Sequence, residues 1–242
     1  MIEVTAVTKA FSTDTAEVRA VDEVNLKVNP RDFVLILGRS GSGKSTLLGM
    51  LAGLIRPTTG TVQLSGRDIA NLPEDEIAGL RAKEIGFVFQ FSGLIPTITA
   101  LENVLLPTLF CPDGAGSRKR AVELLRKVGM SHREDAYPRT LSSGEMKRVA
   151  IARALINDPS ILIADEPTGD LDADTELEIM ELFRELNHDG TTIVMVTHNP
   201  DLVPYATRAY GMDRGKLAEG SSLSSGNRAR QPASPGSRKD AS

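Results

Sequence analysis

The chain contains no tryptophan and a single cysteine, Cys111. One cysteine excludes an internal disulfide and is typical of proteins from a reducing compartment. Aromatic residues make up only 4% of the 242 residues, which argues against the stacking platforms that bind single-stranded nucleic acid. The formal net charge of −4 gives no overall excess of basic residues for a nucleic-acid backbone. We therefore expect no nucleic-acid partner.

Long apolar runs are also missing. No stretch approaches the roughly 18 consecutive apolar residues that would predict a membrane-spanning helix. Residues 1–4 lack the basic start and apolar block of a signal peptide. These absences predict a cytosolic protein, so any role at a membrane would need a membrane-bound partner. Length and composition otherwise allow one sizeable core with a subdomain.

The most informative stretch begins with an apolar run at residues 33–37, which predicts a buried strand. The pattern Gly-x-x-x-x-Gly-Lys-Ser follows at residues 38–45, and an apolar helical pattern with Leu47, Leu48, Leu51 and Leu54 starts there. Glycines let the backbone approach a ligand, and the free N–H groups of a helix start suit an anion. A chance match in a Gly/Ser-rich linker is the alternative, which the flanking strand and helix disfavour. The residues predicted to bind phosphate are Gly38, Arg39, Ser40, Gly41, Ser42, Gly43, Lys44, Ser45 and Thr46.

Within this phosphate-binding loop, Lys44 would reach the β- and γ-phosphates, and the Ser45 hydroxyl would hold Mg²⁺. A second site follows the apolar strand pattern at residues 161–164, where Asp165 and Glu166 stand side by side. Ligands of parallel α/β sheets bind beyond the carboxyl ends of the strands, so both sites would face one crevice. There Asp165 can hold Mg²⁺ through water, and Glu166 can polarise a water molecule. Alternatively, the two acids simply mark a strand-to-helix turn.

Two further polar residues end predicted strands of the same sheet. Gln90 follows the strand pattern that begins at residue 85, and His198 follows the buried strand at residues 192–197. Gln90 offers an amide oxygen to Mg²⁺ or water, and His198 offers a donor to a γ-phosphate. Taken alone, each could be an ordinary satisfied polar residue, but both fall at strand ends beside the two sites above.

The order of the patterns predicts the architecture. Buried strands alternate with helices, which implies an α/β fold with a parallel sheet covered on both faces. Residues 2–8 and 24–28 alternate apolar and polar as half-exposed strands do, with Phe11 in a polar loop between them. Residues 91–140 show helices interrupted by prolines, which indicates a helical insertion. The tail at residues 221–242 is rich in Ser, Gly, Pro and Arg, and we expect it to be disordered.

The segment Ser142-Ser143-Gly144-Glu145 opens another predicted helix. Its Ser-x-x-Glu spacing is a capping box, in which Ser142 and Glu145 bond each other's backbone. The Ser-Ser-Gly sequence also makes an exposed helix start that suits an anion. One chain would then carry two phosphate sites. A head-to-tail homodimer accounts for both, because each ATP would bind between the loop of one subunit and the helix start of the other.

These segments resemble the ATP-binding-cassette (ABC) family over about residues 1–220. Residues 141–155 look like the family signature and its helix, and residues 161–172 resemble its acidic strand and dimer-contacting loop. Gln90 matches the family's glutamine loop, and His198 matches its switch histidine. Phe11, which stands 27 residues before Gly38, matches the aromatic residue that stacks on adenine. That match overturns the alternative in which Phe11 merely caps the core.

The resemblance implies a P-loop NTPase core with an antiparallel β-subdomain and an inserted helical subdomain at about 91–158. It implies an ATPase that uses ATP and Mg²⁺, forms a homodimer and drives a transmembrane permease from the cytoplasmic face of the membrane. It implies catalytic roles for Glu166 and His198, and Mg²⁺ ligation by Ser45, Gln90 and Asp165. Residues 85–91 and 101–107 are similar to the group that serves lipoprotein release, macrolide export and cell division.

The signature departs from the usual Leu-Ser-Gly-Gly-Gln, because Ser143 replaces the first glycine and Glu145 replaces the glutamine. Glu145 adds a negative charge near the partner's γ-phosphate, which costs on the order of 1 kcal/mol when solvated, so we expect weakened but persistent hydrolysis. Two other classes stay open. A cassette acting on DNA or the ribosome would normally carry a long coiled-coil insertion or a second cassette, and neither is present. A regulatory cassette that controls a membrane partner without transport fits the sequence.

Overall fold

A computed structural model describes residues 1–12, 17–111 and 117–220, so the predicted tail at 221–242 lies outside the described residues. A six-stranded sheet forms the centre, in the order β10-β9-β3-β8-β7-β6. All its neighbouring strands run parallel except the terminal hairpin of β9 and β10. Its strands are β3 (Phe33–Leu37), β6 (Ile85–Val88), β7 (Ile161–Asp165), β8 (Thr192–Thr197), β9 (Arg208–Asp213) and β10 (Lys216–Glu219). The predicted parallel α/β core is confirmed.

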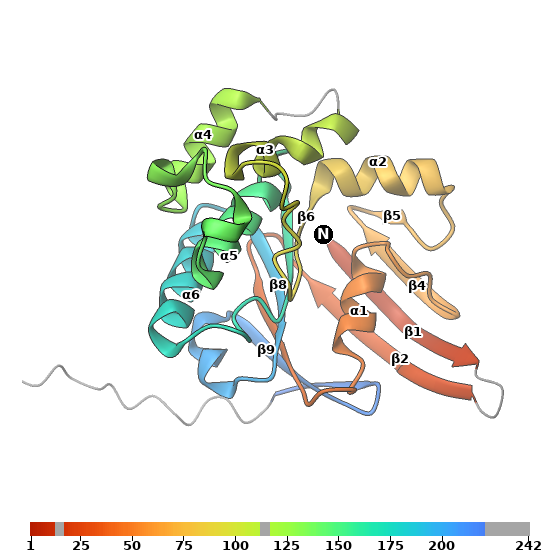
Figure 1. The fold of residues 1–242 in the computed structure, drawn as a ribbon. Coiled ribbons are helices and arrows are strands. Elements are labelled where there is room, and N and C mark those ends of the chain that lie inside the picture. The colour runs from red at the N-terminus through yellow and green to blue at the C-terminus, as the bar shows by residue number, and fades with distance from the viewer. Residues whose placement is uncertain (13–16, 112–116, 221–242) are drawn as a thin grey trace, which may run out of the picture.

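A separate antiparallel sheet holds the N-terminal part of the chain, in the order β2-β1-β4-β5 (Figure 1). Its strands are β1 (Ile2–Ser12), β2 (Glu17–Val28), β4 (Thr59–Leu64) and β5 (Arg67–Asp68). Ala6 and Glu23 have positive φ angles where the pairing of β1 and β2 shifts register, which is how bulges bend such ribbons. Apolar residues of this sheet, of α1 (Lys44–Leu51) and of β3 form one core cluster.

The other face of the central sheet is covered by helices. They are α3 (Ala100–Leu105), α4 (Arg118–Lys127), α5 (Ser143–Ala154) and α6 (Ala173–His188), whereas α2 (Glu74–Glu84) contributes Leu80 to the first core cluster. The 3₁₀ turns are η1 (Leu106–Phe110), η2 (Ser131–Arg133), η3 (Pro138–Thr140) and η4 (Pro200–Tyr205). Helices α3 to α5 belong to the segment predicted as a helical subdomain, and its described residues contain no strand. They share a second core cluster with α6 and the central sheet (Figure 1).

Three local expectations were wrong. Phe11 lies in β1 and pairs with Val18 of β2, so it is not in a loop. Helix α1 ends at Leu51, and Leu54, which follows it, is 51% exposed. The apolar pattern of the helix expected at residues 173–187 predicts an inner face of Leu177, Met180, Leu182 and Phe183, but Leu177 is exposed on α6, whose buried face carries Ile179, Met180, Leu182, Phe183 and Leu186. The Phe11 error arose because polar composition was read as a loop where pairing with β2 continues the strand.

Candidate nucleotide-binding site

The phosphate loop connects β3 to α1, and two of its glycines are required by neighbouring backbone. A Cβ on Gly43, where φ is +105°, would lie 2.0 Å from the Ala20 carbonyl oxygen. A Cβ on Gly38 would lie 2.5 Å from the Met212 carbonyl oxygen. Gly41, with φ +76°, has no neighbour within 4 Å and faces open space. Gly38 and Gly43 therefore shape the loop, while Gly41 leaves room for a ligand.

Lys44 is the buried cation of this loop. Its side chain is only 4% exposed, and its Nζ donates hydrogen bonds to the carbonyls of Gly38 (2.8 Å) and Arg39 (3.1 Å). The same Nζ lies 3.2 Å from Oε1 of Glu166. A buried ammonium needs such partners, and here they hold its positive charge inside the loop, where an anion could reach it.

Ser45 and Asp165 meet at the carboxyl end of β7. The Ser45 hydroxyl donates to Oδ1 of Asp165 at 3.2 Å, although 120 residues separate the two in sequence. Burial raises the pKa of Asp165, while the hydrogen bond from Ser45 opposes that shift. The predicted neighbourhood of the phosphate loop and the acidic strand is thus present.

Glu166 stands at the centre of the site in a strained backbone conformation. Its φ is +41°, which is uncommon outside glycine, and its N–H donates to Val196 of β8. Oε2 lies 2.9 Å from Nδ1 of His198, while Oε1 contacts Lys44. The carboxylate therefore joins the phosphate loop to the histidine that ends β8.

Lys44, Ser45, Glu166 and His198 border one cleft of about 730 Å³, whereas Gly38, Ser42 and Asp165 are not among its lining residues. The lining residues are Ala20, Arg39, Ser40, Gly41, Gly43, Lys44, Ser45, Thr46, Gln90, Glu166 and His198. Within the loop, the buried Ser42 hydroxyl has no hydrogen-bond partner among the described residues. Most of the predicted binding residues thus converge on this cleft, and Gln90 and His198 join them as expected from their strand ends.

The donors around Ser45 suit Mg²⁺. A hydroxyl, a carboxylate and an amide come from Ser45, Asp165 and Gln90, and Mg²⁺ prefers oxygen ligands completed by water and phosphates. The described residues contain no group of three or more His, Cys, Asp or Glu that could hold a metal. A site with few protein ligands, completed by a nucleotide, fits this donor set better than a cage of carboxylates.

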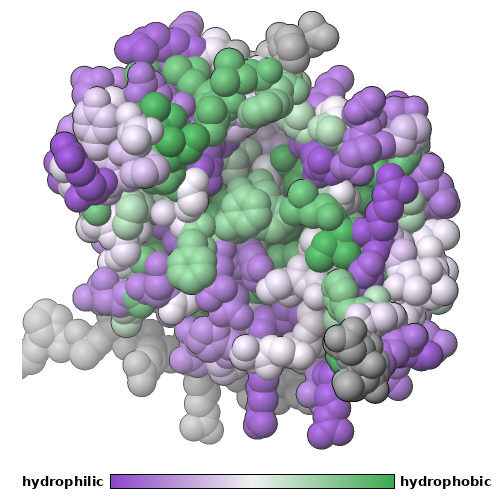
Figure 2. Space-filling view, turned by 45° about the vertical axis from the view of Figure 1, so that its right-hand side comes forward, coloured by the Kyte–Doolittle hydropathy of each residue, from purple (hydrophilic) through white to green (hydrophobic). Residues whose placement is uncertain are grey.

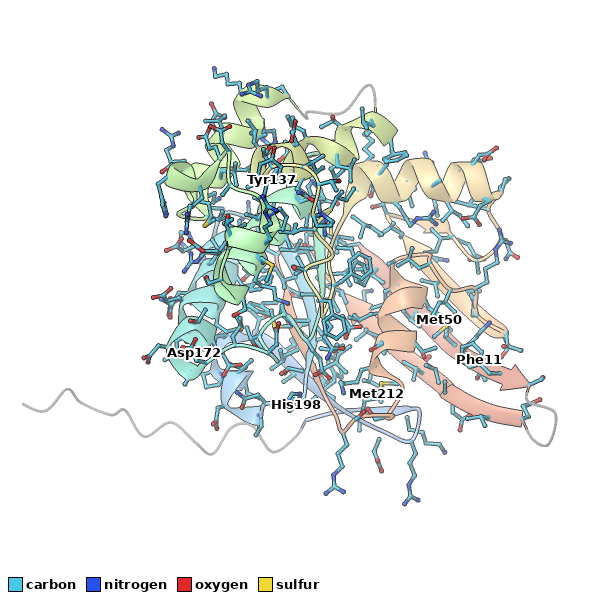
Figure 3. The ribbon with its side chains drawn as sticks, viewed as in Figure 1. Phe11, Met50, Tyr137, Asp172, His198 and Met212 are labelled. Atoms are coloured by element: carbon cyan, nitrogen blue, oxygen red, sulfur yellow. The ribbon has the colours of Figure 1, made fainter. Side chains whose placement is uncertain are left out.

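Phe11 and the segment 142–145 do not line this cleft. Phe11 is 44% exposed on β1, with Lys9 Nζ 5.2 Å from its ring centroid. In Figure 3, Phe11 lies on the right of the molecule and His198 nearer its centre, with α1 between them in this view. The stacking role of Phe11 stays a prediction.

We expect Phe11→Ala to weaken ATP binding without changing the fold. Stacking on an aromatic side chain contributes about 1–3 kcal/mol per base, so the Kd should rise roughly fivefold to 150-fold. GTP should be affected similarly, because every base has a π-face. Nucleotide titration measures both, and Val18→Ala on the neighbouring strand is the matched control. An unchanged Kd would remove Phe11 from the site.

The segment Ser142–Glu145 forms the predicted capping box. Glu145 N–H donates to the Ser142 hydroxyl at 3.2 Å, and Ser142 N–H donates to the Glu145 carboxylate at 2.8 Å. Arg133 also donates to Glu145 at 3.2 Å. The Ser142 N–H bond, and then Arg133, hold the pKa of Glu145 below its usual range. The extra charge in the signature is therefore partly offset within the subunit.

Gly144 is fixed by packing against α6. A Cβ at this position would lie 2.6 Å from Cγ2 of Thr175, so the helix start of α5 sits directly on the first turn of α6. Ser143 is exposed beside it. The segment thus presents an exposed helix start that does not line the cleft of its own chain.

Sequence reasoning missed two groups of residues near the site. Glu176 of α6 accepts hydrogen bonds from Thr168 (2.7 Å) and from Asn199 (3.0 Å), which follows His198. Lys147 of α5 is buried and contacts Gln90 and Asp170. Burial lowers the pKa of Lys147, and Asp170 opposes the shift. A lysine on the core-facing side of a helical pattern was the only available sequence signal.

Comparisons with known proteins agree with the geometry. A family model described as ABC transporter matches residues 21–169. An uncharacterized ABC transporter ATP-binding protein of Methanocaldococcus jannaschii is 46% identical over 220 residues, covering 90% of this chain and 98% of its own. The macrolide export ATP-binding/permease protein MacB of Chlorobaculum tepidum is 42% identical over 219 residues. The chain covers only 34% of that relative's length.

Solved structures resemble the fold closely. The dimeric post-hydrolysis state of the ATP-binding cassette MJ0796, bound to ADP and Pi, is 40% identical and superposes with a TM-score of 0.84. That match covers 90% of this chain and 98% of the other. CbiO1 of Clostridium perfringens, part of an ABC transporter complex, is 30% identical with a TM-score of 0.78, and covers 90% and 86%. Over the described residues, no helix is long and apolar enough to cross a membrane.

Proposed function

The chain belongs to the ABC transporter family, and from this premise we propose that it is the ATPase subunit that powers a membrane permease. It binds and hydrolyses ATP as a cassette of that family. Two copies would close on two ATP molecules and open after hydrolysis, at the cytoplasmic face of the membrane. The observation that carries the proposal is the contact of one carboxylate, Glu166, with both Lys44 and His198 at the ends of three neighbouring strands.

The chain's own residues divide the work on ATP. Lys44 and the loop N–H groups hold the phosphates, which is mostly positioning and electrostatics in phosphoryl transfer. Ser45, Asp165 and Gln90 would hold Mg²⁺, which neutralises charge on the phosphate oxygens when bound. Because Lys44 Nζ is already fixed by two carbonyls, little side-chain freedom remains to be lost when a phosphate arrives.

Glu166 would orient the attacking water and accept its proton. Its Oε2 faces His198, so the histidine can hold the carboxylate before a γ-phosphate arrives and then turn its donor to that phosphate. Release of Glu166 from Lys44 and His198 frees both oxygens for water. The left-handed backbone at Glu166, fixed by the bond to Val196, keeps the carboxylate aimed into the cleft.

The segment Ser142–Glu145 would complete the site of a second copy. It has an exposed helix start, and it does not line its own cleft. MJ0796, which resembles this chain at 40% identity, has been solved as a dimer with ADP and Pi. The dependence of the ATPase rate on protein concentration tests this arrangement. A specific activity that stays constant from nanomolar to high micromolar concentration, in a protein that remains monomeric, would contradict it.

We also propose where the permease docks. Aromatic and aliphatic residues surround a groove of about 480 Å³ between β6, η1 and α5, and Figure 2 shows apolar residues gathered around a hollow on this face. Phe89 and Phe110 line the groove. Phe91 and Leu109, which lie close to them in sequence, are also exposed. Apolar patches of this kind mark interaction sites. A relative that joins cassette and permease in one chain, the macrolide exporter, favours an export-type partner.

We expect Phe110→Asp to abolish stimulation of the ATPase by its permease while leaving the basal rate unchanged. Phe110 is 74% exposed on η1, so the substitution should not disturb folding. An aspartate there would be desolvated on docking, which costs several kcal/mol. Leu177→Asp, at an exposed apolar residue of α6, is the control. Equal loss of stimulation in both variants would contradict a specific groove.

The rate of the purified protein with and without its membrane partner also separates the proposal from a regulatory cassette. A transporter subunit should turn over ATP repeatedly, and its rate should rise when the permease presents its cargo. A regulatory cassette should assemble with its partner in an ATP-dependent manner and show little turnover in either condition. Slow turnover that no partner accelerates would therefore favour regulation over transport.

A further inference from the structure

Lys147 is a basic residue in the interior of the protein. It lies on α5, in the turn that follows Glu145, and its side chain is 1% exposed. Its Nζ donates a 2.6 Å hydrogen bond to the carbonyl oxygen of Gln90 and lies 3.6 Å from Oδ1 of Asp170. A buried ammonium is costly unless it is paired and hydrogen-bonded. These two contacts therefore determine where the side chain points.

The partners of Lys147 come from different parts of the site. Gln90 follows β6 and lines the cleft. Asp170 lies in the loop between β7 and α6, four residues after Glu166. Lys147 itself belongs to the helix that begins at Ser143. One cation thus touches the loop of the magnesium ligand, the loop of the water-activating carboxylate and the helix of the signature segment.

A second basic residue of α5 supports the same loop. Arg153 donates to the carbonyls of Ser92 and Gly93, each at 2.7 Å. The main chain after β6 therefore turns its carbonyl oxygens toward α5, and the exposed Gln90 residue borders the cleft. Lys147 bonds the carbonyl of Gln90 itself, whereas Arg153 bonds the carbonyls two and three residues farther along the chain.

We propose that Lys147 is a positioning residue for the nucleotide site. It fixes the main chain of Gln90 and the loop of Asp170 against α5. The Gln90 amide thereby keeps a fixed position in the cleft relative to the helix start at Ser143. The inference rests on the proposed function, because it takes Gln90 as a ligand of the nucleotide's Mg²⁺. Groups that orient metal ligands typically change metal affinity or activity by about 10- to 100-fold when removed.

A purely structural role predicts a different result. Replacing a buried ion pair by apolar side chains is often neutral or stabilising, whereas removing one partner is costly when the other is left buried and unpaired. Asp170 is half-exposed, so water can solvate its carboxylate once the ammonium is gone. Lys147→Met should therefore retain thermal stability but lose positioning, whereas a merely structural lysine would lose stability without a selective effect on Mg²⁺.

The experiment compares ATP affinity with Mg²⁺ and in EDTA, in the full chain carrying Glu166→Gln to prevent hydrolysis. We expect Lys147→Met to reduce the gain in affinity that Mg²⁺ provides by about 10- to 100-fold, with the affinity in EDTA unchanged. Arg148→Met is the matched control, because Arg148 also lies on α5 but contacts Val128 and Glu178. An equal change in both variants, or none in either, would overturn the proposal.

A second measurement needs no nucleotide. The chain has no tryptophan, so Phe91→Trp, at a 75% exposed residue next to Gln90, provides a unique fluorescent reporter. The anisotropy of that indole should fall with Lys147→Met and stay constant with Arg148→Met. If the parent protein fails to bind Mg-ATP while the anisotropy still falls with Lys147→Met, the proposed function is wrong. The role of Lys147 in fixing the main chain at Gln90 is then still supported. If Lys147→Met leaves the anisotropy unchanged, Lys147 does not fix the main chain at Gln90 and the proposal is wrong.

If Lys147→Met does not fold, Asp170→Asn removes the charged partner at an exposed position. It should also reduce the gain in ATP affinity that Mg²⁺ provides, by a smaller factor than Lys147→Met does. The factor is smaller because Asp170 lies farther from Nζ of Lys147 than the Gln90 carbonyl does. An unchanged gain in Asp170→Asn, together with unchanged indole anisotropy, would overturn the proposal.

Discussion

Glu166→Gln should bind ATP with nearly wild-type affinity while its steady-state hydrolysis falls by about 10²- to 10⁴-fold, the usual contribution of a general base. Glutamine keeps the shape of the side chain and can still bond His198, but it cannot accept a proton. Loss of the 3.2 Å contact between Lys44 and a charged Oε1 also leaves Lys44 free for phosphate. Binding should therefore be preserved or slightly tightened.

The same variant should accumulate closed dimers in Mg-ATP, because the pair cannot proceed to the state that opens. Size-exclusion chromatography with light scattering detects this, and single-turnover assays separate binding from hydrolysis. The control is Glu178→Gln, on the outer side of α6, where the carboxylate pairs with Arg148. Unchanged steady-state turnover in Glu166→Gln would remove this residue from the catalytic role.

Lys44→Ala should lose tight ATP binding. Hydrogen bonds to charged groups contribute about 1.5–3 kcal/mol each, so loss of one or two contacts to phosphates raises the Kd roughly 10- to 10⁴-fold. The ammonium is buried and held by Gly38 and Arg39, so no neighbouring cation can take its place without rebuilding the loop. Isothermal titration with a non-hydrolysable ATP analogue measures the effect.

Lys127→Ala is the comparison for Lys44→Ala. Lys127 forms an ion pair with Asp189 on the surface, and such pairs contribute about 0–1 kcal/mol to stability. Its removal should leave nucleotide affinity unchanged. Wild-type affinity in Lys44→Ala, with the loop intact, would mean that ATP is held elsewhere in the protein.

Much of the fold could be predicted from sequence because its signals are local. The buried strands at 33–37, 161–164 and 192–197 are short apolar runs, and polar residues follow each one. Parallel strands align their carboxyl ends, so those polar residues had to converge. The cleft bordered by Lys44, Glu166 and His198 is the outcome of that rule.

What could not be predicted depends on pairing between distant segments. Phe11 falls in a strand because β1 runs to Ser12 and pairs with Glu17 of β2, a register that polar composition does not reveal. Lys147 was overlooked because its partners come from the segment after β6 and the loop after β7, far away in sequence. Arg133, which offsets the charge of Glu145, was invisible for the same reason. The roles of Phe11 and the signature segment remain predictions.

The bond of Glu166 to both Lys44 and His198 has a consequence for product release. A triphosphate must pull Lys44 away from the carboxylate, because its terminal group competes for the same ammonium. A diphosphate keeps only the β-phosphate beside Lys44, so after loss of inorganic phosphate the Glu166 carboxylate can again share the lysine. We therefore expect a single subunit to distinguish ATP from ADP by itself. ADP should dissociate without a second subunit in place.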